Sequence, residues 1–256
     1  MKWLRQRVLR GELITGVWCN LGSSLTAEIA GLSGFDWVLM DLEHGAGGEE
    51  ALVHQLQALG GTPASAVVRI DWNNVPRFKR VLDLGAHGVM VPYVNNAREA
   101  EQAVAAMRYP PRGIRGVAKL NRASGFGLRF DEYFEAANEN LLTVVQIETE
   151  SGVEHAEEIA SVQGVDVLFI GPLDLSVNLG VPQQLDHPMF RSAVSQVVSA
   201  CRRNGKAAGT LLLKPEQVEQ TIEDGFTFIA LGSDGGMVAA GMRKAATGFD
   251  PYRKKK

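Results

Sequence analysis

The sequence has little of several features that would narrow its function at once. Two cysteines, Cys19 and Cys201, are too few for a disulfide framework, and no Cys-x-x-Cys pair marks a zinc knuckle or a redox couple. The 26 Lys and Arg residues nearly balance 29 Asp and Glu, so no basic excess predicts binding to nucleic acid. No apolar run is long enough to span a membrane or to form the core of a signal peptide. We therefore expect a cytoplasmic protein with small-molecule partners, and neither nucleic acid nor a membrane as partner.

Short apolar runs alternate with amphipathic stretches along the whole chain. Eight runs have the length and the Gly, Pro, Asp or Asn boundaries of strands, at residues 13–19, 37–40, 66–70, 88–91, 143–147, 167–170, 207–212 and 227–231. Helical periodicity is found at residues 25–32, 49–59, 75–84, 97–107, 152–161, 188–204, 215–223 and 236–247. Eight alternations without a linker predict an α/β fold, a single (β/α)₈ TIM barrel that spans residues 1–256 as one domain.

The interval from Tyr109 to Asn140 breaks this rhythm. It is too long for a plain connection between a helix and a strand, and it carries Arg112, Arg115 and Arg122. We expect an extended loop before the fifth strand.

Candidate catalytic residues follow the predicted strands, because barrel enzymes place their chemistry at the carboxyl ends of the strands. Glu148 and Asp174 follow the fifth and sixth strands, and two carboxylates there suit Mg²⁺ or Mn²⁺. An acid and base pair of the glycosidase type is an alternative, and so are structural roles in arginine pairing or helix capping. The turn that begins at Gly171 offers backbone N–H groups to an anion, or is a simple tight loop.

Three further residues have unusual positions. His44 is the histidine at a predicted strand end, where a neutral imidazole serves as a general base if a carboxylate orients it. Arg69 ends an otherwise apolar strand and either meets a ligand oxygen or pairs with an internal acid. Asp83 lies at a helix end, where an anion is disfavoured unless it has a cationic or imidazole partner.

Taken together, these residues resemble the metal-dependent (class II) pyruvate aldolases of the HpcH/HpaI type, which include 4-hydroxy-2-oxoheptanedioate, 2-dehydro-3-deoxyglucarate and 2-keto-3-deoxy-rhamnonate aldolases. The resemblance covers nearly the whole chain. It is carried by residues 34–37 (GFDW) leading to Asp41, Glu43 and His44, then by 67–69 (VVR), 82–85 (LDLG), 108–117 (RYPPRGIRGV), 145–149 (VQIET), 164–166 (GVD), 169–172 (FIGP) and 174–176 (DLS).

The resemblance implies a mechanism and a role for each matching residue. The enzyme would reversibly cleave a 4-hydroxy-2-oxoacid to pyruvate, or to an analogue such as hydroxypyruvate, and an aldehyde through a metal-bound enolate. Glu148 and Asp174 would bind Mg²⁺, Mn²⁺ or Co²⁺. His44 would be the base, Asp83 the acid that raises its basicity, and Arg69 the group that stabilises the enolate. The pyruvate-binding groups would be Gln146 and the turn formed by Gly171, Leu173 and Asp174.

The same resemblance implies no Schiff-base lysine, no nucleotide cofactor, and a homo-hexamer in which the last helix is exchanged between subunits. Two positions depart from the pattern. Leu42 stands where relatives commonly have glycine, and Leu173 where they commonly have alanine or serine, so both add apolar bulk near the site. Alternatives are an enolate enzyme of the same superfamily, either a coenzyme A thioester lyase or an oxaloacetate-decarboxylating synthase, and a catalytically silent barrel that binds an oxoacid.

Overall fold

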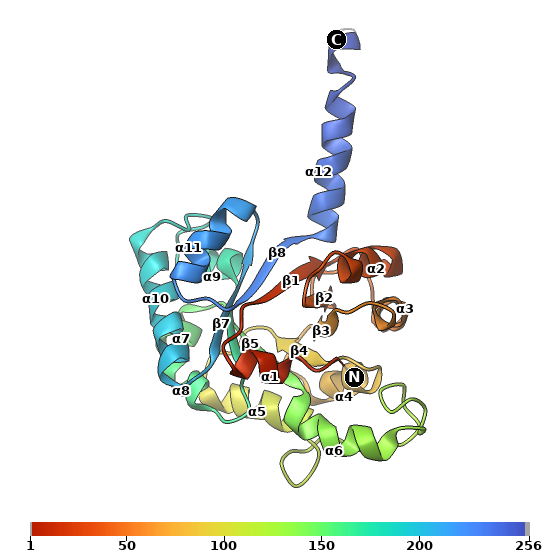
Figure 1. Cartoon of the computed structure of the whole chain (residues 1–256). Coiled ribbons are helices and arrows are strands. Elements are labelled where there is room, and N and C mark those ends of the chain that lie inside the picture. The colour runs from red at the N-terminus through yellow and green to blue at the C-terminus, as the bar shows by residue number, and fades with distance from the viewer. Residues whose placement is uncertain (1, 254–256) are drawn as a thin grey trace.

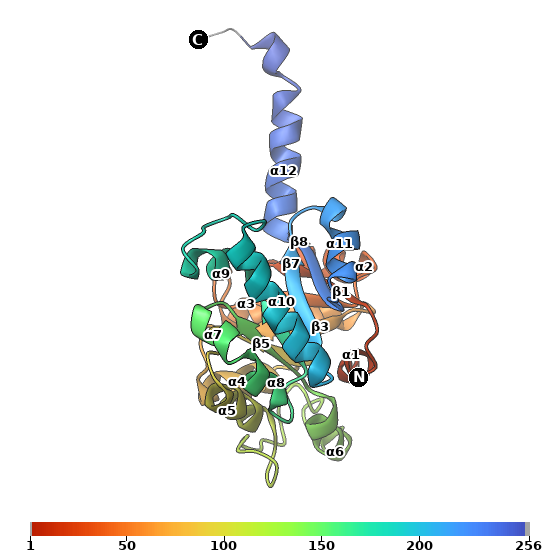
Figure 2. The ribbon, with the colours of Figure 1, turned by 90° about the vertical axis from the view of Figure 1, so that its left-hand side faces the viewer.

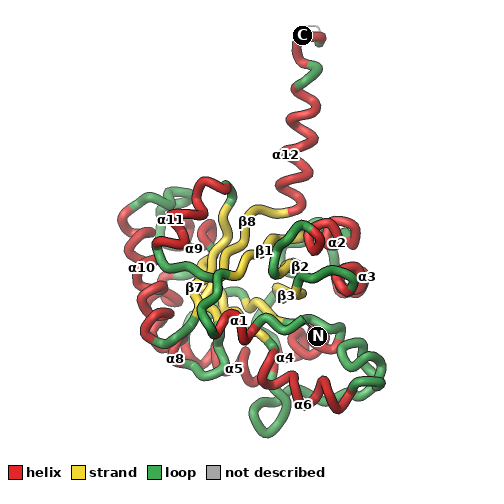
Figure 3. Tube along the Cα trace, viewed as in Figure 1, coloured by secondary structure: helices red, strands yellow, loops and turns green. Residues whose placement is uncertain are grey.

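A closed barrel of eight parallel strands forms the centre of the molecule (Figures 1 and 3). The computed structural model describes residues 2–253. Each strand pairs with the next one in the chain, and β8 pairs with β1. The strands are β1 (Ile14–Cys19), β2 (Trp37–Asp41), β3 (Ser65–Arg69), β4 (Gly88–Val91), β5 (Leu142–Ile147), β6 (Val167–Ile170), β7 (Ala207–Leu212) and β8 (Phe228–Ser233). The predicted TIM barrel is confirmed, with each strand within two residues of its predicted bounds.

Helices surround the barrel and connect its strands (Figure 1). They are α1 (Arg5–Leu9), α2 (Ser24–Leu32), α3 (Glu49–Gly60), α4 (Val75–Asp83), α5 (Ala97–Met107), α6 (Phe130–Asn140), α7 (Glu150–Glu154), α8 (Ala156–Ser161), α9 (Pro172–Asn178), α10 (Pro188–Arg203), α11 (Val218–Glu223) and α12 (Asp234–Thr247), with 3₁₀ turns η1 (Pro215–Gln217) and η2 (Asp250–Tyr252). Within the described residues, no helix is both long and apolar enough to cross a membrane.

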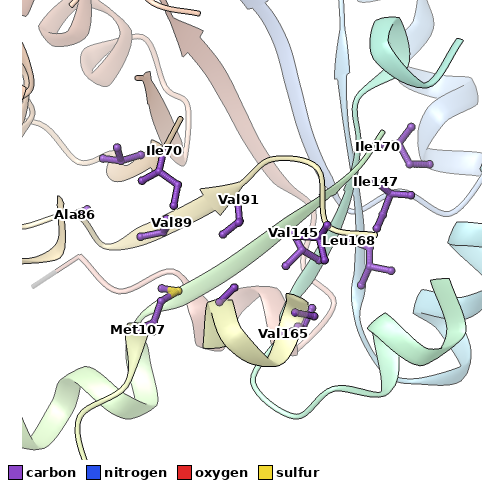
Figure 4. Close-up of a cluster of buried hydrophobic side chains, with 14 of the residues drawn as sticks. Ile70, Ala86, Val89, Val91, Met107, Val145, Ile147, Val165, Leu168 and Ile170 are labelled. Atoms are coloured by element: carbon purple, nitrogen blue, oxygen red, sulfur yellow. The ribbon is translucent and has the colours of Figure 1, made fainter. Parts of the chain in front are cut away.

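Alternation along the strands divides the apolar side chains into two sets. One set joins strand residues to the surrounding helices, and Figure 4 shows part of it, including Met107 of α5 and, farther along the barrel, Val145 near Leu168. The other set consists of strand residues with Val8 of α1 and Leu4 just before it, and it fills the barrel interior. Its large members are Trp18, Trp37, Phe169 and Phe228.

These four aromatic rings pack against each other inside the barrel. Trp37 stacks on Phe228 with ring centroids 4.4 Å apart, and Trp18 lies 5.4 Å from Phe169. A Cβ on Gly16 would overlap the indole of Trp37, so β1 needs glycine there to admit the ring. We call the four rings the aromatic floor, because they close the interior below the carboxyl ends of the strands.

Three elements differ from the sequence-based expectation. The expected loop at residues 109–140 is a loop only to residue 129, since its second part forms α6. The helix expected at residues 152–161 is divided into α7 and α8 at His155. The helix expected at 215–223 begins with the 3₁₀ turn η1.

The last helix projects away from the barrel, as two perpendicular views show (Figures 1 and 2). Its first residue, Asp234, is its one buried residue. Asp234 accepts hydrogen bonds from the backbone N–H groups of Asn20 (2.8 Å) and Leu21 (3.3 Å) and from the hydroxyl of Thr26 (2.6 Å). The base of α12 is therefore fixed to α2 and to the loop that precedes it, while Met237 and Met242 of the helix are exposed.

Candidate active site

The ends of four strands, three of them with polar side chains, meet at the carboxyl end of the barrel. Asp41 ends β2 and is the register partner of Arg69, which ends β3. Gln146 lies in β5 and Glu148 follows that strand directly, while Gly171 follows β6. Because all eight strands are parallel, these ends share one face of the barrel, as predicted.

Arg69 is the centre of a buried ion cluster. Its Nε and Nη2 bind the two oxygens of Asp41 at 2.9 and 2.6 Å, and its Nη1 lies 2.8 Å from Oε2 of Glu43. Burial alone would lower the pKa of Arg69, but the hydrogen bond and charge of Asp41 raise it above the ordinary value. The guanidinium also lies 5.5 Å above the indole ring of Trp18, so it rests on the aromatic floor.

The same aspartate shapes the loop that carries His44. Oδ1 of Asp41 accepts hydrogen bonds from the backbone N–H of Glu43 (3.0 Å) and of His44 (3.2 Å). The His44 side chain is 67% exposed, and its Nε2 lies 3.9 Å from Oε1 of Glu43. Burial raises the pKa of Glu43 above its usual range despite the opposing charge of Arg69. Glu43 thus lies between a buried cation and an accessible imidazole.

Asp83 is not brought to His44 within one chain. It is the last residue of α4, and β4 begins only five residues later, so Asp83 lies at the amino-terminal end of the barrel. There Arg115 donates a hydrogen bond to its Oδ1 at 2.7 Å. The expected cationic partner is present, but it is an arginine and not the predicted histidine.

Glu148 and Asp174 form the second part of the site. Glu148 is 2% exposed, and it accepts hydrogen bonds from Nε2 of Gln146 (2.7 Å) and the backbone N–H of Tyr93 (3.2 Å). Burial, and after it the negative charge of Asp174, raises the pKa of Glu148 to about 7. Within residues 2–253, neither carboxylate is paired with a lysine or arginine. The carboxylates therefore lack a compensating cation in contact.

Two neighbours define the space around Glu148. A Cβ on Gly171 would lie 2.8 Å from Cγ of Glu148 and 3.0 Å from its carboxyl carbon, so the carboxylate packs directly on this glycine. On the other side, Oε1 of Gln146 is buried and has no hydrogen-bond partner among the described residues. A buried amide oxygen without a partner is costly, so this atom is available to a ligand.

The turn after β6 is the short helix α9. Its first turn contains Leu173, which is 57% exposed, and Asp174, which is partly buried. N–H groups in a helix's first turn have no carbonyl of the helix to bind. The expected short helical turn is confirmed.

Tyr93 contributes to the site although the sequence-based assignment gave it no role, whereas Asp41 belongs to the strand-end motif that the sequence placed before His44. Tyr93 follows β4, its hydroxyl donates to Oδ1 of Asp174 at 3.4 Å, and its backbone has a positive φ of 52°. Tyr93 is the second residue after β4, and this position near a strand end is the signal that the sequence offers for it.

The three arginines of the loop before α6 form ion pairs and hydrogen bonds within the protein. Arg112 pairs with Glu139, Arg115 with Asp83, and Arg122 donates to the carbonyls of Leu84 and Leu56. His87 also has a structural contact, because its Nδ1 accepts a hydrogen bond from the backbone N–H of Ala66 at 3.0 Å.

A metal at this site would depend on few protein ligands. No group of three or more His, Cys, Asp or Glu residues able to hold an ion occurs in the part of the chain that the structure describes. Two carboxylates would supply the protein ligands, and water and substrate would complete the shell, as is usual for Mg²⁺.

Known proteins similar to this chain are aldolases and related enzymes. The family model of HpcH/HpaI aldolase/citrate lyase matches residues 14–240. A 5-keto-4-deoxy-D-glucarate aldolase from Klebsiella pneumoniae subsp. pneumoniae is 39% identical over 234 residues, which is 91% of each chain. The crystal structure of an HpcH/HpaI aldolase/citrate lyase family protein from Burkholderia cenocepacia J2315 is 34% identical, with a TM-score of 0.92 over 96% of this chain and 98% of that one. The crystal structure of citrate synthase SbnG is 27% identical, with a TM-score of 0.87 over 98% and 99%.

Proposed function

Because the chain belongs to the HpcH/HpaI aldolase/citrate lyase family and is an aldolase, we propose that it cleaves a 4-hydroxy-2-oxoacid to pyruvate and an aldehyde with a divalent metal ion held by Glu148 and Asp174. The observation that carries this proposal is the pair of carboxylates at the barrel mouth, one of them 2% exposed, with no lysine or arginine paired to either in residues 2–253. Hydroxypyruvate is the analogue of pyruvate to be compared as donor.

The residues present fit a hard divalent cation. Carboxylate oxygens are the ligands that Mg²⁺ and Mn²⁺ prefer, and Co²⁺ accepts the same set. The unpartnered Oε1 of Gln146 is a further oxygen beside the pair. The chemistry that a bound ion supplies is polarisation of the 2-oxo group and stabilisation of the negative charge that develops on its oxygen.

The chain's own groups bind and orient the oxoacid. We assign the carboxylate of pyruvate to the backbone N–H groups of Leu173 and Asp174, which α9 leaves without helix partners. Gly171 keeps the approach to Glu148 open, and the Gln146 side chain faces the same space. This assignment uses every predicted substrate-binding residue.

His44 and Arg69 are assigned to proton transfer and charge stabilisation. In cleavage, His44 takes the proton of the 4-hydroxyl group, the bond between C3 and C4 breaks, and its electron pair forms the enolate of pyruvate as the aldehyde leaves. Protonation of C3 then completes pyruvate. Arg69 has five N–H donors, of which Asp41 and Glu43 engage three, so it retains donors for the enolate oxygen.

Two carboxylates, Glu43 and Asp83, are candidates for the partner of His44. Within one chain the nearby carboxylate is Glu43, 3.9 Å from the imidazole, whereas Asp83 is bound by Arg115 at the other end of the barrel. We therefore expect Glu43→Gln to lower kcat, because a carboxylate beside the imidazole orients it for proton transfer. If Asp83→Asn lowers kcat and Glu43→Gln does not, Asp83 of another subunit is the partner of His44.

We propose a sugar-acid derivative as the first substrate to test. The relatives that match over 91% of both chains are 5-keto-4-deoxy-D-glucarate aldolases. The exposed Leu173 adds apolar surface at the mouth, whereas Leu42 packs against the core between strands and helices. Acceptors of several kinds therefore belong in the assay: a semialdehyde, glyceraldehyde, a hydroxyaldehyde and glyoxylate.

The alternative of a coenzyme A thioester lyase is less well supported by the structure. Such an enzyme needs a basic groove for the nucleotide, and Arg112, Arg115 and Arg122 are all engaged in contacts within the protein. One of the similar structures is a citrate synthase, so condensation with oxaloacetate is the second candidate function.

A pyruvate-release assay tests the proposed function. Candidate 4-hydroxy-2-oxoacids are added to enzyme treated with EDTA, and to the same enzyme after addition of Mg²⁺, Mn²⁺ or Co²⁺. We expect turnover only with metal. Full activity after exhaustive chelation, or trapping of substrate on a lysine by borohydride, would contradict the proposal.

We also propose that six copies assemble and that α12 packs on a neighbouring subunit. The helix has one buried residue in the single chain and exposes Met237, Val238 and Met242. We also propose a cytoplasmic location, because the free, buried Cys19 and Cys201 suit a reducing compartment.

A further inference from the structure

Tyr93 touches both carboxylates of the proposed metal site through different atoms. Its backbone N–H donates to Oε2 of Glu148 at 3.2 Å, and its phenol hydroxyl donates to Oδ1 of Asp174 at 3.4 Å. Glu148 follows β5 and Asp174 belongs to α9, so the two carboxylates come from separate elements. Among the described residues, Tyr93 is the one that hydrogen-bonds to both.

The backbone of Tyr93 adopts a conformation that is unfavourable for a tyrosine. Its φ of 52° lies in the left-handed region, which side chains with a Cβ rarely occupy unless the surroundings enforce it. Such strain is often found where a group must be aimed at a site. Here the unusual φ accompanies an N–H directed at Glu148 and a phenol directed at Asp174.

The surroundings that enforce this conformation belong to β5 and the residues after it. Asn95 donates from Nδ2 to the carbonyl of Tyr93 at 2.8 Å, and its Oδ1 accepts a hydrogen bond from the hydroxyl of Thr149. The backbone N–H of Val94 donates to the carbonyl of Gln146 at 3.1 Å. Gln146 and Thr149 lie on either side of Glu148 in the chain, so the turn at Tyr93 is tied to the strand end that carries the carboxylate.

We propose that Tyr93 is a positioning residue that fixes the carboxylates of Glu148 and Asp174 relative to each other and thereby sets the affinity for the divalent ion. The inference rests on the proposed metal site and adds Tyr93 to the residues that determine the affinity for the ion. Groups that hydrogen-bond to metal ligands typically change metal affinity by about 10- to 100-fold when they are removed. Because the bond to Asp174 is long, we expect the lower end of this range for loss of the phenol hydroxyl.

The test is the affinity of the full-length protein for Mn²⁺ alone, measured by electron paramagnetic resonance of free Mn²⁺ in the absence of substrate. Tyr93→Phe removes the hydroxyl and keeps the backbone, and we expect Mn²⁺ to bind about 10-fold more weakly. The matched control is Tyr109→Phe, which removes a buried hydroxyl that has no partner in the described structure. That variant should bind Mn²⁺ as the wild type does.

A second variant tests the backbone contact. Asn95→Ala removes the bonds to the Tyr93 carbonyl and to Thr149 without touching either carboxylate, and we expect it to weaken Mn²⁺ binding as well. Pyruvate release separates positioning from catalysis, because saturating Mn²⁺ should restore kcat in Tyr93→Phe by mass action.

The outcomes distinguish this inference from the proposed function. Wild-type affinity for Mn²⁺ in both Tyr93→Phe and Asn95→Ala, with unchanged thermal unfolding midpoints, would overturn the role of Tyr93 and leave the metal site standing. Failure of the wild-type protein to bind Mn²⁺ would overturn the metal site itself.

Discussion

Replacing Gly171 by alanine adds one methyl group at the point where the barrel mouth is most tightly packed. The added Cβ would lie 2.8 Å from Cγ and 3.0 Å from the carboxyl carbon of Glu148. Carbon atoms in contact stay about 3.5 to 4.0 Å apart, so the carboxylate must move by about 1 Å. A misplacement of that size can cost on the order of 10²-fold in rate, which is about 2.7 kcal/mol of transition-state stabilisation. We therefore expect kcat/KM of Gly171→Ala to fall by about 100-fold.

The assay is release of pyruvate, coupled to its reduction by lactate dehydrogenase. Gly60→Ala is the matched control, because no heavy atom lies within 4 Å of a Cβ built at Gly60 and the same methyl group is added there. Urea unfolding of both variants shows whether the fold is kept. A folded Gly171→Ala enzyme with wild-type kcat/KM would refute the reasoning that the Glu148 carboxylate must stay against this glycine.

Three further expectations follow from the described contacts. Arg69→Lys should lower kcat by at least about 100-fold, because one ammonium group cannot hold both oxygens of Asp41 and also face Glu43; an unaltered rate would assign Arg69 a structural role. Burial lowers the pKa of His87 to about 4, so between pH 6.5 and 4 the unfolded chain binds a proton that the folded chain does not. The free energy of unfolding should therefore decrease by about 3 kcal/mol as the pH falls through this window, as measured by urea unfolding, and the decrease should be smaller in His87→Gln. Light scattering at micromolar concentration should give about 166 kDa, the mass of six 27.7 kDa chains, and a mass near one chain would contradict the proposed hexamer.

The periodicity of the sequence predicted the barrel because strands buried on both faces leave continuous apolar runs, and all eight runs became strands. The Tyr109–Asn140 interval was harder, since the Pro-Pro-Arg-Gly stretch at its start suggests a loop. Only the residues from Phe130 onward, which form α6, have a helical composition.

The sequence predicts the position of a candidate residue in the barrel well at a strand end and poorly where position along a helix decides. The sequence places Arg69 and Glu148 at strand ends, and the structure does the same. Asp83 ends a helix that runs back along the barrel, so it lies at the opposite end from His44, which a list of motifs does not reveal. Tyr93 escaped notice because its contribution depends on a backbone angle and a hydrogen bond that no residue pattern encodes.

The aromatic floor fills the barrel interior, so the site is reached from the carboxyl end of the barrel. Trp18, Trp37, Phe169 and Phe228 close the interior beneath Arg69, so substrate and products must share the passage at the carboxyl end. In the proposed orientation the pyruvate half lies deeper, beside Gln146 and Glu148, and the aldehyde half lies nearer the solvent. We then expect ordered release, with the aldehyde leaving first and pyruvate last. Pyruvate should accordingly compete with the substrate for free enzyme, whereas the aldehyde should inhibit by recombining with the pyruvate that is still bound.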